Sequence, residues 1–313
     1  MDAHADLDAL VAPLRADTLS GASEVARSAS EVMRRAAVRI LAGSLEELRW
    51  GLGEVAMKVL DAQPSMAPLV RLVQGVLAAA GEADTVEHAR HAAVDAAEAF
   101  RDGLETRETA VAERAAEVLP DSGMIGTISA SSTVRAALVR SAASGAPSTS
   151  RRVLCLESRP MSEGRRLSDS LTDAGVEVVF AVDAAAFSLV PGCEAVVFGA
   201  DSIGDRGVVN KVGSAALAHA AHAAGVPVYV FCDSTKILPV GFPQVIEDDR
   251  PGQEVWEEAP EGVSIWNRYF ETVPLGLITA VVTDEGVLGP DEVEGMREGL
   301  PFPEFLERWA EGR

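Results

Sequence analysis

Hydrophobic residues in the first 119 positions recur at helical spacing, and no strand-like run interrupts them. Ser20-Gly21 breaks the pattern once. Ser44, followed by Glu47 three residues later, is typical of a capped helix start, and prolines punctuate residues 61–68. Helices are expected over 7–14, 22–40, 44–60, 69–80 and 85–119. The pattern predicts an all-helical domain over residues 1–119.

Beyond Gly123 the pattern changes to short apolar runs bounded by Gly, Pro, Asp or Ser. Strands are expected over 124–128, 153–157, 176–182, 195–199, 226–231 and 277–283, with helices over 133–141, 164–173 and 215–224. Strand and helix alternating at this pitch indicate βαβ units. Residues 120–313 are therefore predicted to form an α/β domain, with a mostly parallel sheet that helices cover on both faces.

Polar and basic residues follow several of these predicted strands. Asp201 follows the predicted strand over residues 195–199. After a turn at Gly207, Asn210-Lys211 is expected to open a helix. Ser131, Ser132 and Arg159 follow the first two strands. Because parallel strands end at one edge of a sheet, these residues are predicted to meet there and bind an anion, most simply a phosphate. A serine before a helix is also commonly just an N-cap.

Composition limits the partners of this site. The 313 residues carry 48 Asp and Glu against 27 Lys and Arg, a net charge of −21, which disfavours nucleic acid and anionic membrane surfaces. Lysine occurs only at positions 58, 211 and 236, which fits either a salt-adapted protein or a GC-rich coding sequence. With no basic leader and no apolar span, the chain is expected to be cytoplasmic.

Cysteines and histidines give no reason to expect a metal or a cofactor. Cys155, Cys193 and Cys232 lack the paired spacing of zinc ligands and are expected to be buried. The pairs His88/His91 and His219/His222 each share a helix face, but no carboxylate or cysteine stands at ligand spacing beside them.

Three ordered motifs resemble one family. Glu157-Ser158-Arg159-Pro160, then Gly199-Ala200-Asp201 with Asn210-Lys211, and finally residues 267–274 look like the alpha, beta and delta subunits of translation initiation factor 2B. That family includes ribose-1,5-bisphosphate isomerase and methylthioribose-1-phosphate isomerase. The resemblance covers nearly the whole chain. It implies a helical N-terminal domain, a Rossmann-like doubly wound C-terminal domain, and a homodimer or higher homo-oligomer.

The resemblance also implies site residues. The isomerases use a cysteine after the first strand and the aspartate of the Gly-Ala-Asp loop. Asp201 matches the aspartate, whereas Ser129 stands at the cysteine and Ile128 at the histidine before it. A serine hydroxyl needs a dedicated base to react, while a thiol can be tuned to a thiolate.

Two phosphate-binding arginines of the isomerases are also missing. The Arg-Gly-Ala motif is Ser20-Gly21-Ala22 here, so Gly21 and Ala22 are the remaining implied contacts, and Arg-Pro is Gln63-Pro64. The sequence therefore favours a non-catalytic protein that binds a phosphorylated sugar or nucleotide, in a regulatory or assembly role. The alternative is an aldose–ketose isomerase for a ribose 1-phosphate-type sugar, with Asp201 and Ser129 as catalytic groups.

Overall fold

The computed structural model describes residues 3–18, 20–144, 151–246, 249–302 and 306–307. Two compact units are present: residues up to Thr106 with the described residues after Leu300, and Arg107–Leu300. The units divide inside one long helix, α5 (Val86–Val118). The domain boundary after residue 119 remains a prediction of the sequence.

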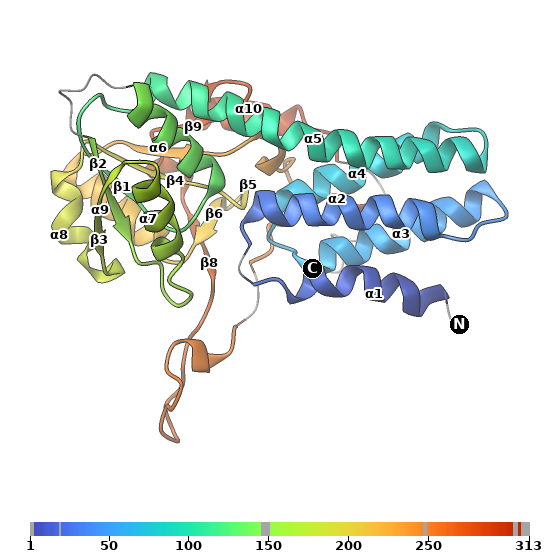
Figure 1. Ribbon diagram of the computed structural model, residues 1–313, viewed down its shortest axis with the longest axis horizontal. Helices are drawn as coiled ribbons and strands as arrows, with labels where there is room; N and C mark the ends of the chain where they lie inside the picture. Colours follow the sequence, from blue (N-terminus) through green and yellow to red (C-terminus); the bar gives the residue numbers. More distant parts are fainter. Residues whose placement is uncertain (1–2, 19, 145–150, 247–248, 303–305, 308–313) are drawn as a thin grey trace. The chain divides into compact units, whose positions relative to one another are not determined.

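The described residues of the first unit form helices and no strand, and the helices include α1 (Ala3–Ala16), α2 (Ala22–Arg39), α3 (Leu45–Ala62) and α4 (Ala67–Glu82) (Figure 1). Ser44 caps α3, because its hydroxyl accepts the Glu47 backbone N–H at 3.2 Å. The Glu47 carboxylate accepts the N–H of Gly43 rather than that of Ser44, so the expected capping box is only half formed. Val25, Met33 and their neighbours on one face of α2 are buried, as the helical spacing predicted.

The second unit contains a seven-stranded sheet in the order β10-β9-β7-β4-β1-β2-β3. Its strands are β1 (Gly123–Thr127), β2 (Arg151–Leu156), β3 (Glu177–Ala181), β4 (Ala195–Phe198), β7 (Val228–Phe231), β9 (Ala280–Val282) and β10 (Val287–Leu288). All neighbouring pairs are parallel except β9 and β10. The six predicted strands and the α/β class are confirmed; β10 was not foreseen.

Helices cover both faces of this sheet, and a separate core lies on each. They are α6 (Ser132–Ser144), α7 (Glu163–Asp173), α8 (Ala186–Leu189), α9 (Ser214–Ala224) and α10 (Pro290–Glu298). Val196 and Phe198 of β4 pack in one core with Leu217 of α9. Val197, one residue away and on the other face, lies in the second core with Leu138 of α6. This alternation is what a strand buried on both sides requires.

A smaller antiparallel sheet corrects one prediction. It has the order β5-β6-β8, with β5 at Ser202–Gly204, β6 at Gly207–Lys211 and β8 at Phe270–Val273. Asn210 and Lys211 therefore end a strand, and the expected helix begins three residues later, at Ser214. The reason is pairing with β8, which is distant in sequence. The Glu271 carboxylate of β8 also accepts the N–H groups of Gly213 and Ala215 and so caps α9.

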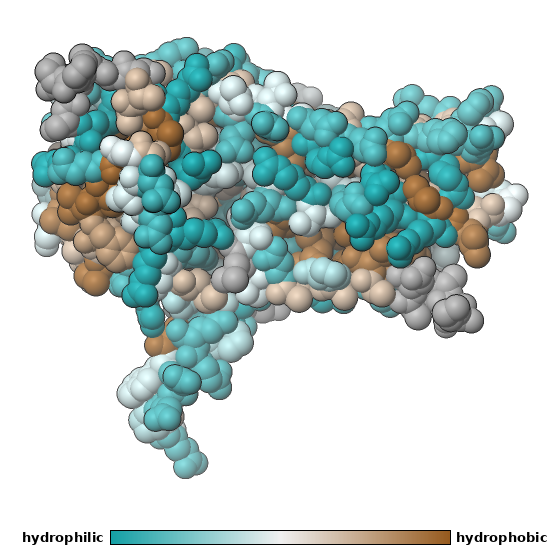
Figure 2. Space-filling model, in the orientation of Figure 1, coloured by the Kyte–Doolittle hydropathy of each residue, from teal (hydrophilic) through white to brown (hydrophobic). Residues whose placement is uncertain are grey.

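A long segment extends away from the sheets between the turn η3 (Ser234–Lys236) and β8 (Figure 1, orange). Mainly hydrophilic residues cover it (Figure 2). Its base is closed where the Arg250 N–H donates to the Asn267 carbonyl and the Tyr269 hydroxyl donates to Glu254. These bonds fix Tyr269 at the start of β8. None of the described helices is long and apolar enough to cross a membrane.

Candidate functional site

Loops from adjacent strands meet at the carboxyl edge of the seven-stranded sheet. Thr127 of β1 is in register with Cys155 of β2 and Val197 of β4, so the chain leaves all three strands at the same level. The Ser129 backbone N–H donates to the Ser158 hydroxyl at 2.7 Å. Gly199 lies so close to Ser131 that a Cβ on it would come 2.8 Å from the serine oxygen. The structure thus joins the loops after β1, β2 and β4.

Ser129 itself has a strained backbone. Its φ of 71° lies in the left-handed region, and Ser158 and Ser162 share this conformation at 63° and 56°. Residues other than glycine adopt this backbone conformation at a cost in free energy that the surrounding structure must balance. Here the bond to Ser158 holds Ser129, while Asp183 accepts the backbone N–H of Ser158 and of Arg159. Strain of this kind concentrates at functional sites.

Four charged side chains form a buried cluster beside these loops. Asp201, Lys211 and Lys236 are 8%, 4% and 3% exposed, and the Lys211 ammonium lies 2.6 Å from Oε1 of Glu163. The Asp201 N–H donates to Val209 of β6, which ties the aspartate loop to the strand that carries Lys211. The cluster therefore draws on the loops after β2, β4 and β7 and on β6.

Burial sets the protonation of Asp201. It raises the pKa of this carboxyl to about 6, with the Glu163 charge adding to the rise, while Lys236 and Lys211 act in the opposite direction. The buried Asp201 carboxyl thus lies within electrostatic range of two buried ammonium groups. Charged groups of both signs gathered at one sheet edge suit a polar, charged ligand.

Two aromatic rings hold Lys211 in position. Its Nζ lies 4.8 Å from the ring centre of Tyr269 and 5.1 Å from that of Phe270, distances at which a ring attracts a cation. Burial, followed by the hydrogen bond to Glu254, raises the pKa of the Tyr269 hydroxyl above its usual range. Tyr269 therefore stays neutral and supports Lys211 without adding charge to the cluster.

The other predicted contacts have structural partners. The Ser131 hydroxyl accepts the Val134 N–H, as an N-cap does, and Ser132 is the first residue of α6. Asn210 donates to the Ser214 hydroxyl and steadies the turn into α9. Arg159 is exposed, and its guanidinium donates to the Val255 carbonyl of the extended segment. Their role as ligand contacts stays a prediction.

Gly21 and Ala22 lie in the helical unit, where Ala22 begins α2 and the Gly21 N–H donates to Glu24. The Gln63 side chain, at the position of a family arginine, donates to the carbonyls of Leu14 and Asp17. Gln63 thus fastens the end of α1 and is not available to a phosphate. A ligand role for Gly21 and Ala22 remains a prediction.

Glu163 was not selected from the sequence, and Lys236 was not named there as a ligand contact. Glu163 reads as an ordinary acidic residue at a helix start, so no pattern singles it out. Lys236 carried a signal, because it is one of only three lysines in the chain. Two of the three are buried in this cluster, whereas Lys58 pairs with Asp8 on the helical unit. In a chain this poor in lysine, each lysine is a candidate for a specific role.

None of the three cysteines replaces the thiol that the site lacks. All three are buried, as expected, and burial raises the pKa of Cys155 and Cys193 to about 11 and that of Cys232 to about 12. Thiols with such values are inert near neutral pH. Among the described residues no group of His, Cys, Asp and Glu is placed to hold a metal ion.

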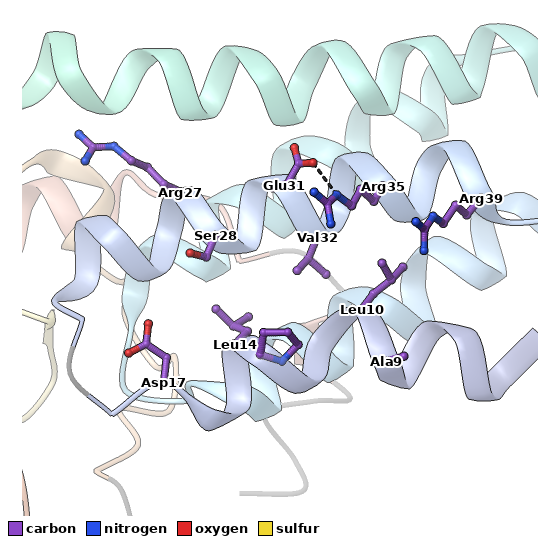
Figure 3. Close-up of a pocket in the computed structure, with 11 residues that line it drawn as sticks. Ala9, Leu10, Leu14, Asp17, Arg27, Ser28, Glu31, Val32, Arg35 and Arg39 are labelled. Carbon is purple, nitrogen blue, oxygen red and sulfur yellow. Dashed lines mark hydrogen bonds and ion pairs between the residues drawn. The ribbon is translucent and has the colours of Figure 1, made fainter.

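A groove of about 670 Å³ lies between α1 and α2 of the helical unit (Figure 3). Leu10, Leu14 and Val32 line it together with arginines of α2. The Arg35 guanidinium is 2.6 Å from Glu31, and hydrogen bonds from Arg34 and Arg35 lower the Glu31 pKa to about 2. Glu31 is thus permanently ionised and already paired, so the groove offers no group poised for proton transfer.

Comparison with known proteins gives a consistent picture. The profile of the Initiation factor 2 subunit family matches residues 18–290. Ribose 1,5-bisphosphate isomerase of Archaeoglobus fulgidus is 28% identical over 287 residues, covering 89% of this chain and 88% of that protein. Methylthioribose-1-phosphate isomerase of Symbiobacterium thermophilum is 35% identical over 172 residues, 51% of this chain and 48% of that protein.

The fold also matches solved structures. Translation initiation factor eIF-2B of Pyrococcus horikoshii superposes with a TM-score of 0.78 at 24% identity, covering 91% of this chain and 97% of that one. The 5-methylthioribose 1-phosphate isomerase of the same organism gives 0.72 at 21% identity, with 94% and 88% covered. At these identities the likeness establishes the fold alone.

Proposed function

This chain belongs to the Initiation factor 2 subunit family, and we propose that within it the chain is an aldose–ketose isomerase for a ribose 1-phosphate-type sugar. The observation that carries the proposal is the buried Asp201, which two buried lysines flank and whose pKa is about 6. Relatives named as sugar-phosphate isomerases support it. The comparisons thus favour the alternative reading of the sequence over the non-catalytic one.

The reaction needs groups of the kind found here. Converting an aldose 1-phosphate to a ketose requires a proton for the ring oxygen, removal of the C2 proton, and a proton at C1. A carboxyl that titrates near neutral pH can give and take protons. With a pKa of about 6, roughly a tenth of Asp201 is protonated at pH 7. The ammonium groups of Lys211 and Lys236 suit the phosphate or the negative charge that develops on the sugar.

A non-catalytic phosphate-binding protein remains the second candidate, and one observation favours it. Ser129 occupies the position of the family thiol, and Ile128, buried against the loop at Gly213, occupies that of the histidine before it. The Ser129 N–H bonds to a serine. A pocket that still binds the sugar but no longer turns it over would retain the lysines and Asp201.

Turnover assays separate the two candidates. The purified chain is incubated with ribose 1,5-bisphosphate and with methylthioribose 1-phosphate, and ketose formation is followed by NMR. We expect one of them to be converted, with Asp201→Asn slowing turnover at least about a hundredfold. Glu31→Gln, which removes a charge from the helical unit, is the matched control and should leave turnover unchanged. Thermal stabilisation by the sugar without turnover would establish the second candidate instead.

We also propose that the chain forms a homodimer or a higher homo-oligomer. Strand β3 is an edge of the large sheet, and Phe180, Val182 and Phe187 on or beside it are 44–59% exposed. Figure 2 shows this apolar surface over β3 and α8. Large exposed apolar side chains at a sheet edge suit a contact with a second copy. Light scattering of wild type and Phe187→Glu tests this; a monomeric wild type would contradict it.

A further inference from the structure

Glu163 is a buried carboxylate with one satisfied and one unsatisfied oxygen. Its side chain is 10% exposed and its Oε1 lies 2.6 Å from the Lys211 ammonium, whereas Oε2 is sealed from solvent without a hydrogen-bond partner. A carboxylate needed only to neutralise Lys211 would be expected to have both oxygens satisfied, since each buried orphan destabilises the fold. The unpaired oxygen is therefore a feature of Glu163 that its ion pair with Lys211 does not explain.

The chain is shaped to bring Glu163 to this place. Glu163 is the first residue of α7, and the next residue, Gly164, lies against the end of β2. A Cβ on Gly164 would come 1.9 Å from the Leu156 carbonyl oxygen, so only glycine lets the helix start so close to the strand. This close approach puts the first side chain of α7 into the cluster at the carboxyl edge of the sheet.

Glu163 faces charged groups from every element around it. Lys211 lies on β6, Asp201 in the loop after β4, and Tyr269 directly before β8. The charge on Glu163 raises the pKa of Asp201 and that of Tyr269. Lys236 of η3 acts on Asp201 from the other side. Glu163 and Asp201 therefore share one buried cluster, in which the charge on Glu163 acts on the Asp201 carboxyl.

We propose that Glu163 is the second acid–base group of the site, paired with Asp201 and taking the proton-transfer role that Ser129 cannot perform. The inference rests on the isomerase function proposed above. Two carboxyls with separate proton states are a common way to divide acid and base tasks. The lysine-bound Glu163 carboxylate is the base and the protonated Asp201 is the acid.

The proton balance closes with these two groups alone. Asp201 protonates the ring oxygen as its bond to C1 breaks, while Glu163 removes the proton from C2, leaving an enol between C1 and C2. Glu163 then returns its proton to C1, and Asp201 takes the proton of the C2 hydroxyl as the C2 carbonyl forms. The aldose has become a ketose, and both carboxyls are back in their starting states.

The test compares Glu163→Gln, Glu163→Asp and Glu177→Gln with wild type on whichever of ribose 1,5-bisphosphate or methylthioribose 1-phosphate the wild type converts. Gln keeps an oxygen toward Lys211 but cannot take a proton, so kcat should fall at least about a hundredfold with KM within about threefold of wild type. Glu163→Asp keeps the charge on a side chain that is one methylene shorter, and its kcat should lie between that of Glu163→Gln and that of wild type. Glu177, exposed at the start of β3, should behave as wild type.

A second readout keeps the test decisive if Glu163→Gln folds poorly. The dependence of kcat/KM on pH, measured on the same substrate for wild type and Glu163→Asp, should change shape, because the Asp201 proton equilibrium responds to the distance of its neighbour. A Glu163→Gln variant with near-wild-type kcat, or with only a raised KM, would overturn the inference and leave the proposed function intact. A wild type that converts neither substrate would overturn both.

Discussion

Two carboxylates of this chain, Glu31 on α2 and Asp201 at the sheet edge, each lie near two cations, yet their acidities shift in opposite directions. Hydrogen bonds from Arg34 and Arg35 lower the Glu31 pKa to about 2. Burial raises the Asp201 pKa to about 6, although Lys211 and Lys236 are close. The Glu31 side chain is about one third exposed, whereas Asp201 is 8% exposed.

The difference shows that nearby cations do not by themselves keep a carboxyl ionised. Arg34 and Arg35 donate to Glu31 directly, at 2.6–2.8 Å, and water still reaches the group. Asp201 feels its lysines only through space and has lost its hydration. Desolvation then outweighs attraction. Glu31, Arg34 and Arg35 form an ion-pair network at the surface of α2, whereas the buried Asp201 has the acidity that the proton transfer proposed above requires.

Breaking the buried ion pair between Lys211 and Glu163 is expected to have the largest effect on the free energy of unfolding. Lys211→Met should leave Glu163 as an uncompensated buried charge and destabilise the fold by about 3–5 kcal/mol, measured by urea unfolding at pH 7.5. Adding Glu163→Gln to it should recover most of the loss. Lys58→Met, which breaks the pair with the more exposed Asp8, should cost less than about 1 kcal/mol. Equal losses of unfolding free energy in Lys211→Met and Lys58→Met would contradict this distinction between the buried and the surface ion pair.

Asp201→Asn is expected to change the free energy of unfolding by a smaller amount and to raise it. The folded pKa of about 6 lies above the ordinary value, so the folded state binds the proton more tightly and loses stability as pH rises through 6. Asn mimics the protonated form. At pH 8 the variant should be about 2–3 kcal/mol more stable than wild type, and this gain should vanish below pH 4. A destabilised variant at pH 8 would show that Asp201 is held as a favourable ion.

The smallest effect is expected for Glu31→Gln. The pKa of Glu31 is lowered, so its contribution is present above the unfolded value near 4 and is lost as pH falls toward 2. Because the pair is partly exposed, the cost at pH 7 should stay below about 1 kcal/mol and shrink further in 1 M salt. Thermal unfolding at low and high salt measures this; a salt-independent loss would place Glu31 with the buried groups.

The two regions also differ in how far the sequence predicts them. Helices of the first unit and the parallel strands of the second follow from apolar periodicity, which local residues set. The small sheet does not, because β6 ends at Lys211 only through pairing with β8 about sixty residues later. Asp201 was selected as a polar residue at the end of a strand, and Lys211 as a basic residue at an expected helix start. Glu163 was not, since its burial depends on Gly164 fitting against β2, a contact that no spacing rule reveals.

The proposed function depends most on Asp201 exchanging its proton near neutral pH. Sugar phosphates also titrate near pH 6, so a rate profile alone mixes protein and substrate. The direct measurement is a carbon-13 NMR titration of aspartate side-chain carboxyls in the ligand-free wild type, with Asp201→Asn identifying the resonance. We expect a midpoint near pH 6 for Asp201. A midpoint at or below about 4, the ordinary range of an aspartate, would contradict it.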